Sequence, residues 1–210
     1  MNFFLGEDYQ INPEPAYEDD IQDGGIIYQP DVYEDARKRI QVYQARSLFV
    51  DVGCGRAGKL LALKGVETVG IDYKNNVKWL RESFPTRTWL DIDLETIKSD
   101  ALSKSILLGS TVICADVVEH LRDPSNLLRC LSEWISVVRE VVFTTPEREL
   151  HYGYNHRGPP RNTHHVREWN TKEFESLLKS FGFRPQMFLT RTSTDCWLKH
   201  HTIEVICTRE

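Results

Sequence analysis

Cysteine is used sparingly in this chain and in no metal-binding or disulfide pattern. There are 5 cysteines among 210 residues, and no Cys-x-x-Cys pair. An odd number without ligand spacing argues against a disulfide framework and against a zinc site. Cys114, Cys130 and Cys207 lie in apolar stretches and are expected in the core, and Cys54 is expected to fit a tight turn.

Long apolar runs and an excess of basic residues are also absent. No stretch approaches the length of a membrane span, and the first residues carry neither a basic region nor a cleavage site. The formal net charge is −5, whereas a general nucleic-acid binder is usually basic. We therefore expect a cytoplasmic, soluble protein with no membrane partner, and with nucleic acid disfavoured as a partner but not excluded. A chain of 210 residues suits one domain with a sizeable core.

From residue 31 onward, apolar runs alternate with helical patterns. Residues 1 to 30 are acidic and interrupted by Pro13, Pro15 and Gly24-Gly25, which predicts an irregular arm or lid. Strands are predicted at 48–52, 68–71, 87–92, 111–115, 141–145, 186–191 and 202–208, and helices at 31–46, 58–64, 75–83, 125–138 and 171–181. Thr171 is the predicted cap of the last helix, and Gly182 is its predicted end. This alternation predicts a parallel α/β sheet.

The most informative stretch is Asp51-Val-Gly-Cys-Gly-Arg-Ala-Gly58, which ends the first apolar run, with Asp72 closing the next. This is the βαβ signature of a nucleotide-cofactor site, and the glycine spacing also fits a dinucleotide such as NAD. However, Asp51 stands where the loop would cradle a pyrophosphate, and a carboxylate repels an anion and attracts a cation. S-adenosylmethionine carries a sulfonium and an ammonium but no phosphate. It is therefore the favoured cofactor, with Asp72 accepting hydrogen bonds from its ribose hydroxyls.

Polar residues follow each predicted parallel strand. Ligands of such sheets bind beyond the carboxyl ends of the strands, where the strand order reverses. The residues at these ends are Asp51 and Gly53, Asp72, Asp91 and Asp93, Asp116, and Thr145-Pro-Glu147. Their convergence predicts one site at one edge of the sheet.

Three motifs resemble class I S-adenosylmethionine-dependent methyltransferases in order and spacing: Asp51-Val-Gly-Cys-Gly55, Gly70-Ile-Asp72 and Asp116-Val-Val-Glu-His-Leu-Arg-Asp-Pro124. The resemblance implies a doubly wound, Rossmann-like sheet of seven strands, mostly parallel with an antiparallel C-terminal hairpin, and with helices on both faces. It covers roughly residues 47 to 210, and we predict the methyltransferase domain at residues 31 to 210. The cofactor-binding residues it implies are Asp51, Gly53, Cys54, Gly55, Asp72, Tyr73, Asp93, Leu94 and Asp116, with Asp91 competing with Asp93 for the adenine contact.

Two clusters could activate an acceptor hydroxyl, a poor nucleophile that needs a base or a metal. Asp116, Glu119 and His120 would share one face if their segment were helical, and His164-His165 precede the last long helix. Together they resemble two metal-dependent branches of the family, the 2′-O-methyltransferases of small-RNA 3′ ends and the quinone-pathway O-methyltransferases.

That resemblance implies Mg²⁺ or Mn²⁺ held by Asp116, Glu119, His120 and His165, with His120, His164 and His165 as catalytic candidates. The first acid is Asp where these branches carry Glu, which is one methylene longer. Metal-free relatives with a similar Glu-His-Leu-x-Asp-Pro run use the Glu and His to cap or pack the helix, and that alternative stays open.

A long segment, residues 146 to 170, stands where a short connection would suffice, and long loops in compact domains are usually functional. Within it, residues 148 to 167 form a basic island: Arg148, His151, His156, Arg157, Arg161, His164, His165 and Arg167 face a single acid, Glu149. The run from Gly158 to Trp169 is similar to methyltransferases of surface glycans and glycoconjugates. It predicts a sugar or glycan acceptor, whose rings and hydroxyl or phosphate groups the aromatic and arginine side chains of the loop would contact. The alternative is a turn at Gly158-Pro159-Pro160 with solvated arginines.

Other functions compete with sugar O-methylation. They are RNA ribose 2′-O-methylation, methylation of a small quinone-type acceptor, NAD-dependent catalysis, and cofactor binding without activity. The arm, which carries Tyr9, Tyr17 and Tyr28, is predicted to close over the cationic cofactor.

Overall fold

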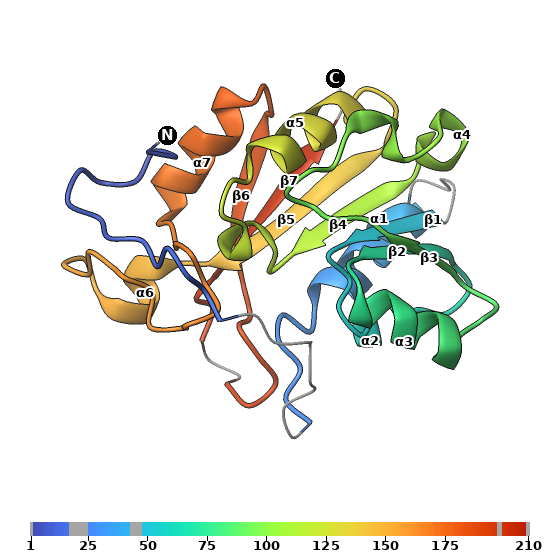
Figure 1. Ribbon diagram of the computed structural model, residues 1–210, viewed down its shortest axis with the longest axis horizontal. Helices are drawn as coiled ribbons and strands as arrows, with labels where there is room; N and C mark the ends of the chain where they lie inside the picture. The colour runs from blue at the N-terminus through green and yellow to red at the C-terminus, as the bar shows by residue number, and fades with distance from the viewer. Residues whose placement is uncertain (1, 17–24, 43–47, 197–198, 209–210) are drawn as a thin grey trace.

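The strands of the computed structural model form one seven-stranded sheet in the order β3-β2-β1-β4-β5-β7-β6 (Figure 1). The structure describes residues 2–16, 25–42, 48–196 and 199–208. The strands are β1 (Leu48–Val52), β2 (Glu67–Asp72), β3 (Thr88–Asp91), β4 (Thr111–Ala115), β5 (Glu140–Pro146), β6 (Pro185–Thr190) and β7 (Thr202–Thr208). Each lies within two residues of its predicted bounds.

The pairing directions confirm the predicted doubly wound fold. β1 pairs in parallel with both β2 and β4, so the strand order reverses between β1 and β4. β7 lies antiparallel between β5 and β6, which forms the C-terminal hairpin. Every residue of β1 and β4 is buried, as expected for central parallel strands covered on both faces.

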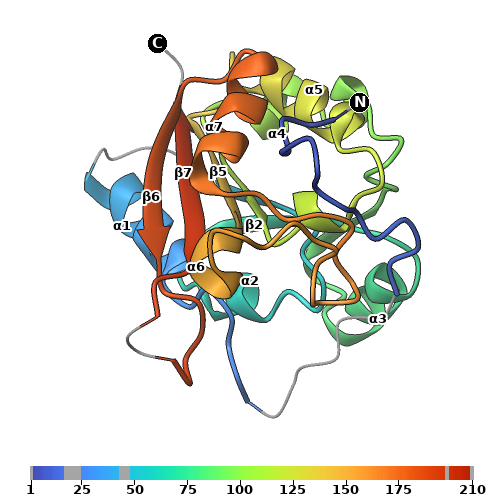
Figure 2. The same cartoon turned by 90° about the vertical axis from the view of Figure 1, so that its left-hand side faces the viewer.

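Helices cover both faces of the sheet, each over its own apolar cluster (Figure 2). One face packs against α1 (Val32–Val42), α2 (Gly58–Ala62) and α3 (Asn75–Ser83). The other packs against α4 (Lys104–Leu107), α5 (Ser125–Trp134) and α7 (Thr171–Ser180). The short elements η1 (Ser99–Ala101), η2 (Val118–His120) and α6 (Arg148–Tyr152) lie in connections. None of the helices in the described ranges is long and apolar enough to span a membrane.

The helices differ from the prediction in several places, among them α2, which ends at Ala62 rather than at residue 64, and α6, which was not predicted. α1 ends at Val42, and residues 43 to 46 of the predicted helix lie outside the described residues. α5 ends at Trp134, four residues before the predicted end. η1 and α4 were not predicted, because elements of three and four residues are too short to show a helical period.

The predicted cap of α7 was wrong by one residue. Asn170, rather than Thr171, is the cap: its side-chain oxygen accepts from the Glu173 N–H at 2.9 Å, and Glu173 accepts from the Asn170 N–H at 3.0 Å. This reciprocal capping box satisfies two donors at the helix start. Thr171 instead donates its backbone N–H to Glu147 at 2.9 Å.

The N-terminal arm packs onto the long segment 146–170 (Figure 2). Phe3 and Leu5 are buried in the cluster beneath α7, and the Trp169 indole donates to the Phe3 carbonyl at 3.0 Å. Residues 17–24, including Tyr17, lie outside the described residues. Residues 2–16 of the arm are therefore an integral part of the fold on the α7 side, whereas Gln29 bonds to Thr192, after β6.

Candidate active site

The glycine loop after β1 turns sharply beside the segment that follows β4. Gly53 and Gly55 adopt φ of 74° and 53°, and the N–H groups of Gly53 and Cys54 both donate to the Ile71 carbonyl. A Cβ on Gly53 would lie 2.5 Å from a methyl carbon of Val117. Gly53 is therefore required both by its backbone conformation and by this close approach. Cys54 is buried in the turn, as predicted.

The Asp72 carboxylate lies directly against this loop. It accepts hydrogen bonds from the Gly55 N–H at 2.7 Å, the Tyr73 N–H at 2.7 Å and the Asn76 side chain at 3.1 Å. Asp72 is only partly buried, so its carboxylate remains accessible from the surface beside the loop. The loop and this acid are thus in contact, as their order in the sequence suggested, and the ribose contact of Asp72 stays a prediction.

Asp91 and Asp93 both lie at the adenine end predicted beyond β3. Asp91 stands beside Asp72 in the sheet and accepts from the Lys74 N–H at 3.0 Å. Asp93 accepts from the Glu95 N–H at 2.9 Å, and Leu94 is buried. The adenine contact of Asp93, Leu94 and Tyr73 stays a prediction, with Asp91 as its competitor.

Asp51 is buried beneath the glycine loop. The Tyr33 hydroxyl, on α1, reaches both carboxylate oxygens at 2.9 and 3.0 Å. Burial raises the pKa of Asp51 to about 7, against the lowering effects of Tyr33 and Lys59. The electrostatic argument from the sequence therefore needs an amendment: at neutral pH this carboxyl is only about half ionised.

Asp116 does not share a helix face with Glu119 and His120, contrary to the predicted spacing argument. Only Val118–His120 form a short 3-10 helix, and Asp116 lies before it with φ of 54°. Its N–H donates to Thr144 Oγ1 at 3.2 Å, and that hydroxyl donates to Gln29 Oε1 at 2.5 Å. These contacts hold Asp116 in a conformation that non-glycine residues rarely adopt.

Glu119, His120 and His165 nevertheless converge. One potential ligand atom from each lies within 4.8 Å of the others. The His120 and His165 rings meet edge to face, with centroids 4.7 Å apart. The segment after β4 and the long loop therefore meet at the carboxyl end of the sheet, although 45 residues separate the histidines along the chain.

Burial disfavours charge on both Glu119 and His120. Glu119 is fully buried, and neither carboxylate oxygen has a hydrogen-bond partner among the described residues. Burial, followed by the neighbouring Asp116, raises the pKa of Glu119 well above its usual value. Burial, followed by the nearby His165, lowers the pKa of His120 to about 4, so the imidazole is neutral at pH 7, and the Glu119 carboxyl is a group whose ionised form a cation would stabilise.

A divalent ion fits this donor set. The three potential ligand atoms all lie within 4.8 Å of one another, so a divalent ion would be held by Glu119, His120 and His165 after a local adjustment of these side chains. One carboxylate and two imidazoles suit a borderline metal better than a strictly oxygen-loving one. Asp116 lies outside this group of three, although its Oδ1 is buried and has no partner among the described residues.

His164 points toward the arm. Its Nδ1 bonds to the Ala16 carbonyl at 2.8 Å, and its backbone N–H donates to Asn162 Oδ1 at 3.0 Å. The structure therefore groups His165, and not its neighbour, with Glu119 and His120. A catalytic role for His164 stays a prediction.

The basic island divides into buried and exposed arginines. Arg148 is 2% exposed and forms two hydrogen bonds with Glu173, at 2.7 and 3.0 Å. Arg167, equally buried, donates to the carbonyls of Leu121 and Arg122 at 3.0 and 2.7 Å. The alternative of solvated arginines therefore does not hold for these two, because they fasten the loop to α7 and to the segment after η2.

Two residues beside His165 were not singled out by the sequence. Glu168 Oε1 lies 2.6 Å from His165 Nδ1, and Asn162 Nδ2 lies 3.0 Å from His165 Nε2. A spacing of three residues to Glu168 was visible in the sequence. It carries no information without a helix, and this loop is irregular.

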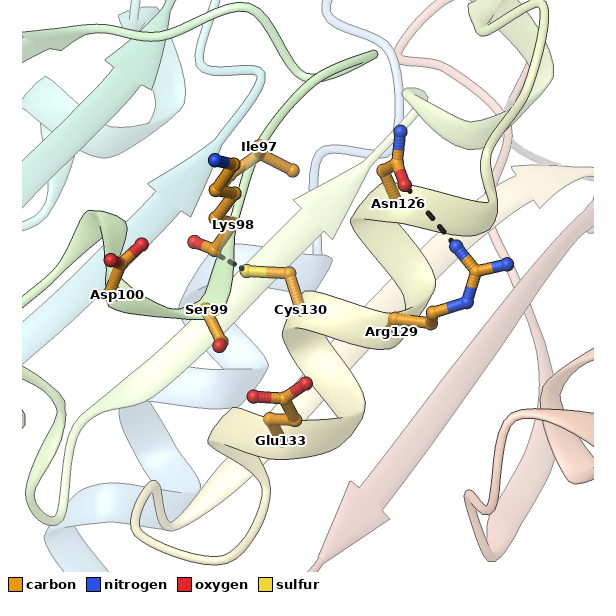
Figure 3. A pocket seen from close by; sticks show the side chains of 8 residues that line it. All are labelled: Ile97, Lys98, Ser99, Asp100, Asn126, Arg129, Cys130 and Glu133. Atoms are coloured by element: carbon orange, nitrogen blue, oxygen red, sulfur yellow. Dashed lines mark hydrogen bonds between the residues drawn. The ribbon is translucent and has the colours of Figure 1, made fainter.

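A pocket of about 390 Å³ lies elsewhere, between residues 97–100 and α5 (Figure 3). Cys130 Sγ donates to the Lys98 carbonyl at 3.5 Å on its floor, and Arg129 contacts Asn126. Its charged side chains are of both signs, and it includes none of the residues assigned above.

Comparison with known proteins places the chain among methyltransferases. A family model described as a methyltransferase domain matches residues 28–186. The ubiquinone biosynthesis O-methyltransferase of Pseudomonas putida is 26% identical over 102 residues, which cover 47% of this chain and 44% of that protein. The match therefore spans less than half of that relative's length.

Two solved structures resemble the fold. The methyltransferase domain of bacterial CtHen1 has a TM-score of 0.58 at 19% identity, over 87% of this chain and 100% of that one. The N-terminal domain of EvdMO1, determined in the presence of SAH and D-fucose, has a TM-score of 0.56 at 15% identity, over 96% of this chain and 90% of that one. At these identities the likeness concerns the fold.

Proposed function

Since the chain belongs to the methyltransferase domain family, we propose that it methylates a sugar hydroxyl, in a glycan or a nucleotide-linked sugar, with help from a divalent cation. The family match and the fold identify an S-adenosylmethionine-dependent methyltransferase domain. The acceptor, the cation and the roles of individual residues are the proposed parts.

The cofactor end of the site is formed by the glycine loop and Asp72. S-adenosylmethionine supplies an electrophilic methyl group. The half-exposed Asp72 carboxylate can accept hydrogen bonds from ribose hydroxyls, and its bond to the Gly55 N–H keeps the loop and the acid in register. In this proposal these residues bind and orient the cofactor, and the acceptor hydroxyl is activated at another part of the same sheet edge.

The observation that carries the hydroxyl chemistry is the convergence of Glu119, His120 and His165. During methyl transfer the hydroxyl oxygen forms a bond to carbon as the carbon–sulfur bond breaks, and the hydroxyl proton must leave. A divalent ion on these three side chains would lower the pKa of that hydroxyl. Asp116 is an electrostatic neighbour of Glu119 and is a further carboxylate that could take the proton or join the ligand set.

The acceptor side is formed by the exposed part of the long loop. Tyr154 is 74% exposed, and the Arg161 guanidinium lies 5.0 Å from the centre of the Tyr152 ring. Aromatic faces and arginine forks suit sugar rings and their hydroxyl or phosphate groups. The D-fucose named with the EvdMO1 domain, and the glycan-type run from Gly158 to Trp169, support a sugar rather than another acceptor.

The test is turnover of S-adenosylmethionine with free, nucleotide-linked and polymeric sugars, short RNAs and phenolic quinone precursors. Each acceptor is assayed with EDTA, with Mg²⁺ and with Mn²⁺. We expect methylation of a sugar that EDTA abolishes and added Mg²⁺ or Mn²⁺ restores. Sugar methylation that is indifferent to EDTA would contradict the metal part, and methylation of RNA alone would contradict the sugar part.

Variants locate the chemistry. Glu119→Gln is expected to lower turnover by at least about 100-fold while S-adenosylhomocysteine still binds, because the change removes charge from the metal group and leaves the glycine loop intact. Glu133→Gln, on the exposed side of α5, is the matched control and is expected to turn over normally. Normal turnover by Glu119→Gln would refute the assignment.

A phenolic acceptor is the second candidate. The match to the ubiquinone biosynthesis O-methyltransferase favours it, over 102 residues. Methylation of a catechol or quinone precursor in the same panel, with no sugar methylated, would select this function and would leave the metal proposal standing.

A further inference from the structure

A buried carboxylate is paired with His165. Glu168 Oε1 lies 2.6 Å from His165 Nδ1, and the two residues are 0% and 6% exposed. An ionised carboxylate only accepts hydrogen bonds, so Nδ1 carries the hydrogen and Nε2 keeps its lone pair. The main chain of Glu168 is itself fixed, since its N–H donates to the Tyr9 hydroxyl and its carbonyl accepts from Arg148, both at 3.0 Å.

The opposite side of the ring gives the same tautomer independently. Asn162 Oδ1 accepts from the His164 N–H at 3.0 Å, which fixes the orientation of the Asn162 amide. The Asn162 NH₂ group therefore faces His165 Nε2, at 3.0 Å, and can only donate to it. Nε2 must then be the unprotonated nitrogen.

His120 is held in the matching state. Its Nδ1 lies 3.0 Å from the His164 carbonyl, which can only accept, so Nδ1 is protonated and Nε2 is free to coordinate. The two rings meet edge to face, with their centroids 4.7 Å apart. One histidine is thus oriented by a backbone carbonyl and the other by a carboxylate, the two partners that most often orient metal-binding imidazoles.

We propose that Glu168 is a positioning residue that locks His165 as the Nδ1–H tautomer and directs Nε2 to the metal group, with Asn162 occupying that lone pair when no ion is bound. The part of this inference that concerns the ion rests on the proposed function. The part that concerns the tautomer of His165 does not. An ion that binds Nε2 would displace the Asn162 amide. Glu168 and Asn162 should therefore have opposite effects on metal affinity.

The first readout is binding of Mn²⁺ alone to the cofactor-free protein, followed by electron paramagnetic resonance. Glu168→Gln keeps the shape of the side chain and removes its charge, and we expect Mn²⁺ affinity to fall about 10- to 100-fold. Asn162→Ala is expected to bind Mn²⁺ at least as tightly as the unaltered protein, and Glu133→Gln to bind it equally well. Unchanged affinity in Glu168→Gln would overturn the role in metal binding.

The second readout reports the tautomer directly. Spectra of ¹⁵N-histidine-labelled protein near pH 8, assigned with His165→Gln, are expected to show His165 protonated at Nδ1. In the Asn162→Ala background, where the amide no longer holds Nε2, Glu168→Leu, or Glu168→Ala if the leucine variant does not fold, is expected to shift His165 toward the Nε2–H form, whereas Asn162→Ala alone keeps the Nδ1–H form. A persistent Nδ1–H form would overturn the proposal. Absence of Mn²⁺ binding by the unaltered protein, with the tautomer as expected, would instead contradict the metal part of the proposed function.

Discussion

At the residue scale, the pair of Tyr33 and Asp51 connects α1 to the floor of the glycine loop. The Tyr33 hydroxyl bonds to both oxygens of Asp51, and both residues are buried. Because the aspartate is removed from water, its protonated form is favoured in the folded protein. Stability and the state of the cofactor loop are therefore coupled to pH through one carboxyl group.

The sign of this coupling can be derived. The pKa of Asp51 rises from 3.8 to about 7 on folding, so between these values the folded state binds a proton that the unfolded state has lost. The free energy of unfolding therefore falls as pH rises through this window. Asp51→Asn keeps an acceptor for Tyr33 and cannot ionise.

We expect the unaltered protein to lose roughly 3 kcal/mol relative to Asp51→Asn between about pH 4 and pH 8. Urea unfolding of both proteins at the two pH values measures the difference between their free energies of unfolding. The contributions of the other titrating groups are common to both proteins and cancel in this difference. An equal difference at both pH values would show that Asp51 titrates normally.

At the element scale, α7 is the support of the long loop. Its capping residue Asn170 follows Trp169 directly, and its first turn supplies Glu173 to the buried Arg148. The helix start thus joins the cap, the loop and α6 in one network. A change at the cap should be felt as helix stability rather than as cofactor affinity.

Asn170→Ala is expected to lower the free energy of unfolding by about 1 kcal/mol, because the Glu173 N–H loses its acceptor. Thr171→Ala should cost less, since the Thr171 hydroxyl makes a 3.3 Å contact to Glu147 and its N–H bond survives the change. Chemical denaturation of both variants compares them. A greater loss of unfolding free energy in Thr171→Ala than in Asn170→Ala would instead support Thr171 as the cap, as the sequence suggested.

The elements that could be predicted are those with a strong local period. All seven strands and the longer helices α3, α5 and α7 appear where the apolar pattern placed them, because burial on one or both faces dictates that pattern. The shared helix face expected for the segment from Asp116 to His120 was wrong, because the conformation of Asp116 is set by hydrogen bonds to Thr144, on a neighbouring strand.

At the scale of the whole molecule, the arm lies along the long loop by backbone hydrogen bonds. The N–H groups of Gln10, Asn12 and Ala16 donate to carbonyls of Arg157, Val166 and Thr163, at 2.7 to 2.9 Å. The arm thus covers the loop that carries His165. Its predicted closure over the cofactor stays a prediction.

Gly158 offers a precise test of this contact. It has φ of 71°, and a Cβ there would lie 2.0 Å from the Gln10 carbonyl oxygen. Gly158→Ala is expected to detach the arm, which should raise amide exchange in residues 6–16 by at least about tenfold and lower turnover, with S-adenosylhomocysteine binding retained.

The control is Gly65→Ala, whose φ is 72° and whose added Cβ would meet no atom within 4 Å. It carries the same backbone strain without the collision. Equal exchange in the two variants would show that strain, and not the arm contact, is responsible.

The sequence by itself determined the order of the elements, the glycine loop and its partner Asp72. These features depend on local turn chemistry and on apolar periods, which neighbouring residues specify. Only the tertiary structure decided which histidine joins Glu119, which arginines are buried, and how far the pKa of Asp51 rises. Each of these depends on burial and on contacts between segments far apart in the chain, such as His120 with the His164 carbonyl, and spacing along the sequence does not encode them.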